Sequence, residues 1–158
     1  MIQEATMTDA AIMVDLMHNA FEEYRHTAYS SSALDETLST VIEGFSNGTK
    51  SLILYNEYQE PVAMVRYTTS QGFLHFFRLA VKKNAQGKGY SKQLLFVLEK
   101  IAQAHKLPFL SCEVRSNVPR NVQLYTKIGY EEVESKIVKK TAEADIKILT
   151  MVKKLMDA

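Results

Sequence analysis

Two glycines, Gly87 and Gly89, lie in a short polar loop between an apolar β-type run and an amphipathic segment. The run covers residues 74–81. Apolar residues recur at helical spacing after the loop, at Leu94, Leu95, Leu98, Ile101 and Ala102. A strand that passes through glycines into a helix leaves backbone N–H groups unpaired at the positive helix end. Because glycine has no side chain to block an anion, this arrangement is typical of a site for a phosphorylated ligand.

The spacing of the loop excludes two common phosphate-binding motifs. A nucleoside-triphosphate loop would need a glycine where Asn84 stands, and a dinucleotide loop, GxGxxG, would need one where Lys92 stands. The pattern Gln/Arg-x-x-Gly-x-Gly/Ala does fit, with serine in the last place, as Gln86, Gly87, Lys88, Gly89, Tyr90 and Ser91. This segment resembles the coenzyme A pyrophosphate loop of the GNAT superfamily of N-acetyltransferases. The departure at Ser91 is small, because a hydroxyl at a helix start can cap the helix or bind phosphate.

The composition favours one globular domain. At 158 residues, with 46% hydrophobic and 23% charged residues, the chain has the size of a single domain, which we expect to span residues 1–158. Nineteen Lys and Arg residues against 18 Asp and Glu leave a formal charge of +1. This balance gives no overall electrostatic basis for binding nucleic acid or an anionic membrane.

Cysteine and histidine usage argues against a metal site. The one cysteine, Cys112, excludes an internal disulfide and a multi-cysteine metal site, and His18, His26 and His105 are scattered without metal-ligand spacing. The chain has no long apolar run, and its first residues do not form a signal peptide. We therefore expect a cytoplasmic protein without a metal.

Hydrophobic periodicity and turn residues predict the order β-αα-βββ-α-β-α-ββ. The predicted strands cover residues 1–6, 51–55, 62–69, 74–81, 109–114, 130–138 and 146–153. The first predicted helix is capped by Thr8-Asp9 and reaches Phe21, and the second covers residues 33–45. The third is the helix after the glycine loop, which ends near His105. The fourth is a short helix over residues 122–128 that Gly129 closes. GNAT enzymes show this order, so the resemblance covers essentially the whole chain. It implies an α+β (mixed α/β) GNAT acyl-CoA N-acyltransferase fold, with a mostly antiparallel twisted sheet flanked by helices.

The resemblance also assigns residues that hold the coenzyme. In the family, the strand before the loop splays from its neighbour and offers a free edge to the pantetheine arm. Here that edge corresponds to the backbone of Leu79, Ala80 and Val81, and the pyrophosphate would bind the loop from Gln86 to Ser91. Lys88 and Lys92 could add positive charge toward the phosphates, or could equally be solvated lysines beside a helix start.

A second signature, LYTKIGY at residues 124–130, resembles the LYxKxGF segment of the family. Tyr125 matches a tyrosine that in many members lies near the coenzyme sulfur and acts as a general acid. The alternative is that Tyr125 only packs against the sulfur or hydrogen-bonds it. Many members carry a coenzyme-contacting asparagine seven residues earlier, where this chain has Val118. Asn117 and Asn121 are therefore the candidates for that contact.

The resemblance suggests His75 as the general base. Counted back from Gln86, His75 falls where some members place a catalytic glutamate, and a neutral imidazole can accept a proton near neutral pH. Strand alternation predicts two faces, with His75, Phe77 and Leu79 on one and Phe76 and Arg78 on the other. A purely structural histidine, Glu113 acting instead, and deprotonation by water are the alternatives.

The acceptor pocket of this family is built from the first two helices, their connecting loop and the last strand pair. The corresponding residues here are 21–32 and 134–145. The side chains of Glu22, Glu23, Tyr24 and Tyr29 could bind a cationic amine, although Glu22-Glu23 could equally be a solvated helix end.

The resemblance implies an N-acetyltransferase that transfers an acetyl group from acetyl-CoA to a primary amine of a small molecule or of a peptide or protein. The alternative is a non-catalytic acyl-CoA-binding sensor or regulatory module on the same fold. Retention of Tyr125 beside the loop favours the enzyme. A homodimer is compatible with either reading.

Overall fold

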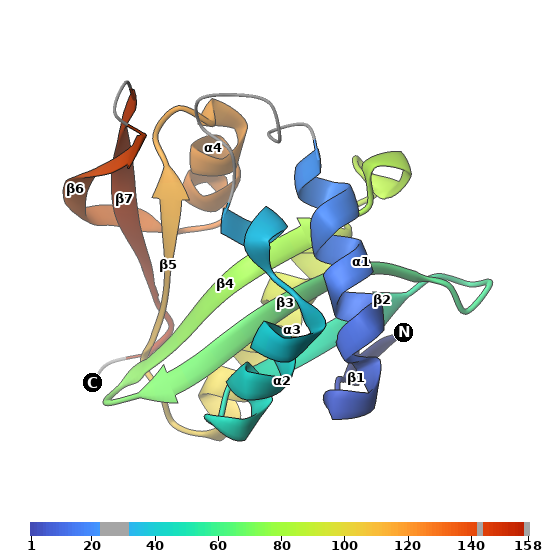
Figure 1. Cartoon of the computed structure of the whole chain (residues 1–158). Helices are drawn as coiled ribbons and strands as arrows, with labels where there is room; N and C mark the ends of the chain where they lie inside the picture. Colours follow the sequence, from blue (N-terminus) through green and yellow to red (C-terminus); the bar gives the residue numbers. More distant parts are fainter. Residues whose placement is uncertain (23–31, 142–143, 157–158) are drawn as a thin grey trace. The chain divides into compact units, whose positions relative to one another are not determined.

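The computed structural model describes residues 1–22, 32–141 and 144–156 (Figure 1). Within it the chain forms two compact units. The first unit comprises Met1–Thr68 and Phe76–Leu98, and the second comprises Thr69–His75 and Glu99–Ala158.

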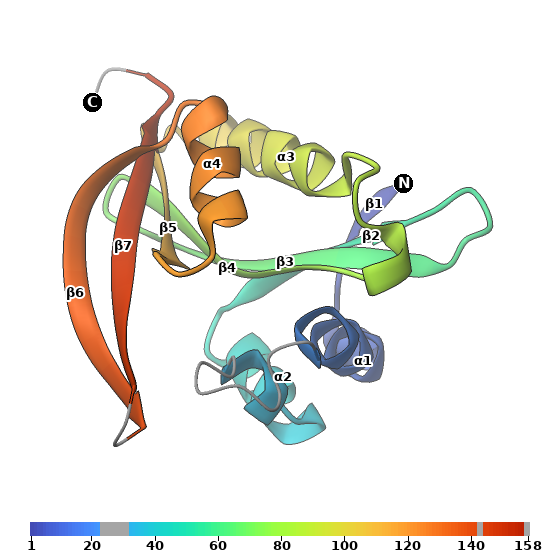
Figure 2. The ribbon, with the colours of Figure 1, turned by 90° about the horizontal axis from the view of Figure 1, so that it is seen from above.

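Four neighbouring strands form the sheet of the first unit, in the order β1-β2-β3-β4. Their bounds are Ile2–Glu4 for β1, Lys50–Tyr55 for β2, Pro61–Ser70 for β3 and Phe73–Val81 for β4. β1 pairs with β2, and β2 with β3, in antiparallel register. Helices α1 (Ala10–Phe21) and α2 (Leu38–Ser46) lie on one face of β2 and β3, and the start of α3 (Tyr90–Ala104) lies on the other (Figure 2).

The core of the first unit lies between the sheet and α1. Met13, Leu16 and Met17 of α1 are fully buried, and Ile12 and Phe21 pack against the same cluster. These residues recur every three or four positions, so the apolar stripe that predicted the helix is the face that the helix buries. The first strand and α1 are joined by a short 3-10 turn, Met7–Asp9, in which the backbone N–H of Thr6 donates to Oδ2 of Asp9 at 2.9 Å.

The second helix begins later than predicted. Helical periodicity suggested a start at Ala33, but Ser32–Asp35 form a 3-10 turn and α2 starts at Leu38. Thr37 is the N-cap, because its Oγ1 accepts a hydrogen bond from the backbone N–H of Thr40 at 3.3 Å. The break between the turn and the helix leaves Glu36 outside both elements.

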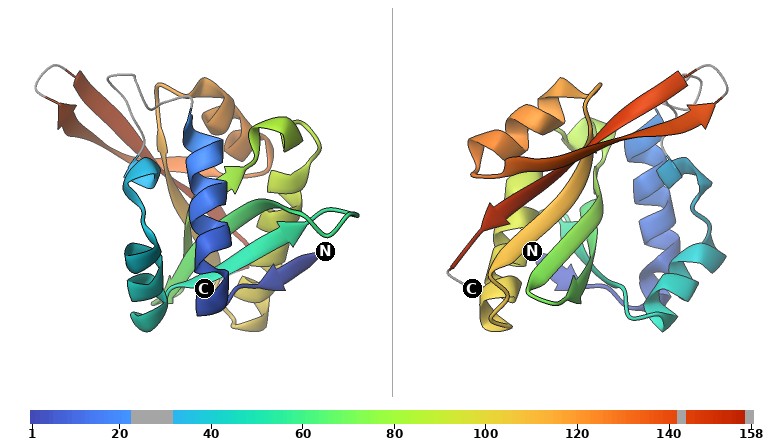
Figure 3. Two further views of the ribbon diagram at one scale, coloured as in Figure 1. Left: turned by 45° about the vertical axis from the view of Figure 1, so that its right-hand side comes forward. Right: turned by 90° about the vertical axis from the view of Figure 1, so that its left-hand side faces the viewer.

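The second unit contains the ends of β3 and α3, the start of β4, and then β5 (Phe109–Arg115), α4 (Pro119–Lys127), β6 (Glu131–Thr141) and β7 (Ala144–Lys154). Its strand order is β4-β5-β7-β6. β4 and β5 are parallel, whereas β5–β7 and β7–β6 are antiparallel. Figure 3 shows β6 and β7 as long neighbouring strands. The predicted α+β class with mostly antiparallel strands is therefore confirmed.

Local residues explain the bounds of α4. The helix starts at Pro119 rather than at the predicted residue 122, since proline is tolerated in a first helical turn. Gly129 (φ 103°) ends the helix, and the backbone N–H of Tyr130 donates to the carbonyl of Tyr125 at 2.9 Å. No helix within the described residues is long and apolar enough to cross a membrane.

Candidate functional site

The glycine loop leads directly into a helix, as the sequence predicts, and no described side chain covers its two glycines. After a 3-10 turn at Lys83–Ala85, Gly87 (φ 81°) and Gly89 (φ 82°) both adopt the left-handed conformation, and α3 begins directly afterwards at Tyr90. A Cβ built on either glycine would meet none of the described heavy atoms within 4 Å. The two glycines therefore allow the left-handed backbone of the loop, and they leave open space in front of the helix start.

Strand β4 changes conformation part-way along its length. Its ladder with β5 joins Phe73, Leu74 and His75 to Phe109, Leu110 and Ser111, and Arg78 further along has a left-handed φ of 54°. Positive φ is uncommon for a residue with a long side chain and marks an irregularity of the strand. The three residues expected to offer backbone to a pantetheine arm, Leu79, Ala80 and Val81, follow directly after this point.

The alternation predicted for β4 is wrong at Arg78. The Phe77 ring lies 5.7 Å from the guanidinium carbon of Arg66, and Arg78 and Arg66 both contact the carboxylate of Glu36. Phe77 and Arg78 therefore approach the same cluster of side chains, although strict alternation would separate them. The positive φ at Arg78 accounts for the difference, because it breaks the two-residue repeat of an extended strand.

Tyr125, the predicted general acid, lies in the second unit on α4 and is buried. Its ring makes an edge-to-face contact with the ring of Tyr130, with centroids 5.4 Å apart. Burial, with a smaller contribution from the Cys112 thiol, raises the pKa of Tyr125 far above that of a free phenol. Tyr125 therefore carries its proton at neutral pH.

Cys112 is part of the same buried cluster. Burial raises the pKa of its thiol to about 12, with the nearby carboxylate of Glu113 adding to the shift. A thiol that stays protonated is a poor nucleophile, so Cys112 packs in the core rather than attacking a substrate.

His75, the predicted base, is half-buried at the end of the β4–β5 ladder. Its Nδ1 lies 3.0 Å from Oγ of Ser111, the residue opposite it on β5. Burial lowers the pKa of His75, and the opposing effect of Glu113 is smaller. The imidazole is therefore neutral at neutral pH, as a base must be. Glu113, the rival candidate, is exposed and its Oε2 lies 2.9 Å from Nζ of Lys136.

Four of the remaining predicted residues are exposed or half-buried. Asn117 is exposed in the turn before α4, and Asn121 is half-buried in the first part of that helix. Lys88 is exposed in the loop, and Glu22 is exposed at the end of α1. The other acceptor-pocket candidates, Glu23, Tyr24 and Tyr29, lie outside the described residues.

Comparison with known proteins decides the family. The model of the GNAT acetyltransferase domain matches residues 5–155, almost the whole chain. This chain belongs to the GNAT acetyltransferase family. No curated protein matches it significantly.

Many solved structures share the GNAT fold of the chain. A ribosomal-protein-alanine N-acetyltransferase from Brucella melitensis superposes with a TM-score of 0.78 at 20% identity, covering 98% of this chain and 99% of its own. A GNAT-family acetyltransferase from Streptococcus pneumoniae gives 0.79 at 20% identity, with 98% and 99% covered. An N-acetyltransferase from Staphylococcus aureus gives 0.79 at 15% identity, with 99% and 98% covered. At these identities the likeness establishes the fold.

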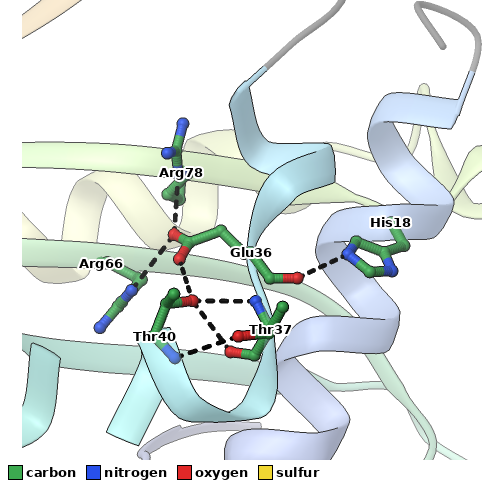
Figure 4. Close-up of polar contacts among 6 residues, drawn as sticks. All are labelled: His18, Glu36, Thr37, Thr40, Arg66 and Arg78. Carbon is green, nitrogen blue, oxygen red and sulfur yellow. Dashed lines mark hydrogen bonds and ion pairs between the residues drawn. The ribbon is translucent and has the colours of Figure 1, made fainter. Parts of the chain in front are cut away.

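A buried ion cluster in the first unit of this GNAT chain was not predicted. Oε2 of Glu36 lies 3.1 Å from Nε of Arg78 and 3.5 Å from Nη1 of Arg66, and Oε1 accepts a hydrogen bond from Oγ1 of Thr40 at 2.7 Å (Figure 4). The carbonyl of Glu36 lies 2.8 Å from Nε2 of His18 (Figure 4). The cluster thus joins α1, the segment before α2, β3 and the left-handed residue of β4.

Arg66 is the buried centre of this cluster. Its side chain is 4% exposed, and the rings of Phe45 and Phe77 lie 6.0 and 5.7 Å from the guanidinium carbon. Gly44 of α2 makes room for it, because a Cβ there would overlap Nη2 of Arg66. Arg66 within the apolar run of β3 is the one sign of this cluster in the sequence, because a buried charge requires a counter-charge.

Glu36 supplies the counter-charge to both arginines. Burial alone would raise the pKa of Glu36, but hydrogen bonds from Thr40 and Arg78 and the charges of Arg78 and Arg66 outweigh it and hold the pKa below its ordinary value of 4.5. A carboxyl with a lowered pKa stabilises the fold above its unfolded pKa, and that contribution is lost as the pH falls through the folded value.

We expect Glu36→Gln to lower the free energy of unfolding by about 3 kcal/mol at neutral pH, because it leaves buried Arg66 without its counter-charge. The difference from wild type should persist down to about pH 4.5 and shrink below it, where the Glu36 carboxylate of the wild type itself becomes protonated. Denaturant unfolding at several pH values measures both effects. Glu43→Gln, the same change at an exposed position of α2, is the control. Equal losses in the two variants would contradict a stabilising role for the cluster.

Proposed function

We propose that this GNAT acetyltransferase transfers an acetyl group from acetyl-CoA to a primary amine of a small molecule or of a peptide or protein. The observation that carries the proposal is the open, left-handed glycine pair directly before α3, in a chain that belongs to this family. Unpaired N–H groups at a helix start, at the positive end of its dipole, suit a pyrophosphate.

The proposal assigns two sets of residues to the coenzyme. The backbone of Leu79, Ala80 and Val81 binds the pantetheine arm, as a strand edge binds an extended chain. The remaining coenzyme contacts are assigned to Gln86, Gly87, Lys88, Gly89, Tyr90, Ser91, Asn117, Asn121 and Tyr125. No metal takes part in this scheme. We also propose that residues 1–158 act as one domain in the cytoplasm.

The reaction requires a proton to move from the acceptor nitrogen to the coenzyme sulfur. The amine nitrogen forms a bond to the thioester carbonyl carbon, the carbon–sulfur bond breaks, and the sulfur leaves with the bonding electron pair. Tyr125 donates its hydroxyl proton to that sulfur, and His75, directly or through water, accepts the proton that the nitrogen loses. The position of Tyr125 in the LYxKxGF-like segment supports its part in this scheme, and its phenol is protonated at neutral pH, as an acid must be.

If His75 is the base, the profile of kcat/KM against pH has an acidic limb with a midpoint below 6.5, because burial lowers the pKa of this histidine. His75→Gln should flatten or displace that limb and lower kcat/KM by roughly 10²-fold, with acetyl-CoA affinity preserved. Steady-state rates between pH 5 and 9 measure this. Glu113→Gln tests the rival base in parallel. A His75→Gln enzyme with the same limb and the same rate would leave His75 a structural residue of the sheet.

Incubation of the protein with acetyl-CoA, a thiol-detecting reagent and a panel of amines tests the proposed function. The panel should contain polyamines, amino acids, aminoglycosides and peptides with free N-termini or lysines. Thiol release that depends on one class of amine supports the transferase. Binding of acetyl-CoA without turnover on any amine would favour the acyl-CoA sensor, and absence of binding would reject both.

A further inference from the structure

Arg78 has a backbone conformation that residues with long side chains rarely adopt. Its φ of 54° lies in the left-handed region, which costs such a residue more free energy than an extended conformation does. A residue stays in a conformation of this kind only where its surroundings hold it there. One contact suited to hold it is the ion pair in which Oε2 of Glu36 lies 3.1 Å from Nε of Arg78 (Figure 4).

Glu36 is itself fixed through both its carboxylate and its backbone. Oε1 accepts a hydrogen bond from Oγ1 of Thr40 at 2.7 Å, and Oε2 also lies 3.5 Å from Nη1 of buried Arg66. The carbonyl of Glu36 lies 2.8 Å from Nε2 of His18 on α1. The Glu36 side chain is 11% exposed, so water screens these contacts little. The carboxylate therefore offers Arg78 a partner that does not move.

The left-handed residue interrupts the alternation of side chains along β4. Strict alternation would put Phe77 and Ala80 on opposite faces of the strand. In the structure Ala80 belongs to the core cluster that packs against α1, and Arg78 contacts Glu36 directly before α2. Because α1 and α2 lie on the same face of the sheet, Phe77, Arg78 and Ala80 all approach that face (Figure 2). The two-residue repeat therefore restarts at Arg78.

The same interruption sets which backbone groups face each edge of β4. The backbone N–H of Lys82 donates to the carbonyl of Val62 on β3 at 2.9 Å. Since successive residues of a strand direct their backbone groups to opposite edges, Ala80 also faces β3, whereas Leu79 and Val81 face away from it. A strand end shifted by one residue would reverse these directions.

We propose that Glu36 is a positioning residue for coenzyme binding. Its carboxylate holds Arg78 in the left-handed conformation, and this conformation directs the backbone of Leu79 and Val81 to the edge where the pantetheine arm binds. Glu36 touches no coenzyme atom in this scheme and acts through Arg78. The inference rests on the proposed function, because it requires the pantetheine arm at this edge. Apparent affinity for acetyl-CoA then follows the fraction of molecules in which Arg78 is left-handed.

Two substitutions of Arg78 separate its conformation from its charge. Both Arg78→Gly and Arg78→Ala remove the ion pair with Glu36, but glycine adopts a positive φ without the cost that alanine bears. Calorimetric titration of acetyl-CoA should find Arg78→Gly within about threefold of wild type and Arg78→Ala about tenfold weaker. Equal affinities of the two variants would overturn the proposal.

Gln59 provides a matched control for this pair. It is exposed in the turn between β2 and β3, and its φ of 62° is close to that of Arg78. Gln59→Gly should be more stable to heat than Gln59→Ala for the same backbone reason, but the two variants should bind acetyl-CoA equally. A difference in affinity as large as that of the Arg78 pair would mean that lost stability alone weakens binding, and would reject the proposal.

A double-mutant cycle assigns the role to Glu36. Glu36→Gln in the otherwise wild-type chain should weaken acetyl-CoA binding about fivefold, because a neutral amide holds the guanidinium less strongly than a carboxylate does. In the Arg78→Gly background the same substitution should cause no further loss, since glycine does not need the ion pair. An equal loss in both backgrounds would show that Glu36 acts through Arg66 or through overall stability, and would overturn the proposal.

NMR spectroscopy of the coenzyme-free protein tests the conformation itself. A positive φ brings the amide proton of a residue close to its own α proton, so the nuclear Overhauser effect between them is strong. Residue 78 should show this signal in wild type and lose intensity in Glu36→Gln and Arg78→Ala; an unchanged signal in both would overturn the proposal. Wild type that does not bind acetyl-CoA would reject the proposed function and this inference with it. Binding by wild type with equal affinity in every variant would reject the inference alone.

Discussion

Tyr125→Phe is expected to lower kcat by about 10–1000-fold, because general acid catalysis is commonly worth about 10²–10⁴ in rate. The substitution keeps the buried ring and its edge-to-face contact with Tyr130, and removes only the hydroxyl. Acetyl-CoA affinity should change little, since the hydroxyl acts mainly when charge develops on the sulfur. Single-turnover kinetics under conditions where chemistry limits the rate, together with calorimetric titration of acetyl-CoA, measure the two quantities separately.

Tyr130→Phe is the matched control, because Tyr130 is a second buried phenol in the same cluster. It should leave kcat within a few-fold of wild type. A Tyr125→Phe enzyme with wild-type single-turnover rates would remove Tyr125 from proton transfer. Equal rate losses in both variants would indicate damage to the packing of the cluster instead.

Gly89→Val should weaken acetyl-CoA binding by about 10–100-fold while the protein remains folded. The valine side chain would enter the space in front of the helix start, which in the structure is open, and loss of hydrogen bonds to a charged group typically costs about 1.5–3 kcal/mol. Calorimetric titration of acetyl-CoA into the folded variant measures the change in affinity.

Gly48→Val provides the control for backbone strain. Gly48 follows α2 with a φ of 91°, close to the 82° of Gly89, and a Cβ there would also meet none of the described atoms within 4 Å. Both variants should lose similar stability, but only Gly89→Val should lose affinity. Unchanged affinity in folded Gly89→Val would mean that the loop does not hold the coenzyme.

Much of the fold could be predicted because its local signals agree. The apolar stripe of α1 and the glycine end of α4 at Gly129 each depend on neighbouring residues. The glycine loop could be predicted for the same reason, since its pattern is contiguous. The start of α2 was missed because Thr37 forms a cap that competes with the helical periodicity before it.

The buried ion cluster could not be predicted, because its members are distant in the sequence. Glu36, Arg66 and Arg78 come from three separate segments, and only folding brings the carboxylate between the two guanidinium groups. The left-handed conformation of Arg78 was missed as well, since nothing local distinguishes an arginine in an extended strand from one at an irregularity.

The most direct test of the proposed function follows an isotopically labelled acetyl group from acetyl-CoA into the acceptor. Mass spectrometry of the amine panel after incubation should find the label in an amide of one amine class, with one free coenzyme A formed for each amide. The Tyr125→Phe enzyme should form the same product more slowly. Intact labelled acetyl-CoA bound to the wild-type protein, with no labelled amide on any member of the panel, would contradict the transferase and leave a coenzyme-binding protein.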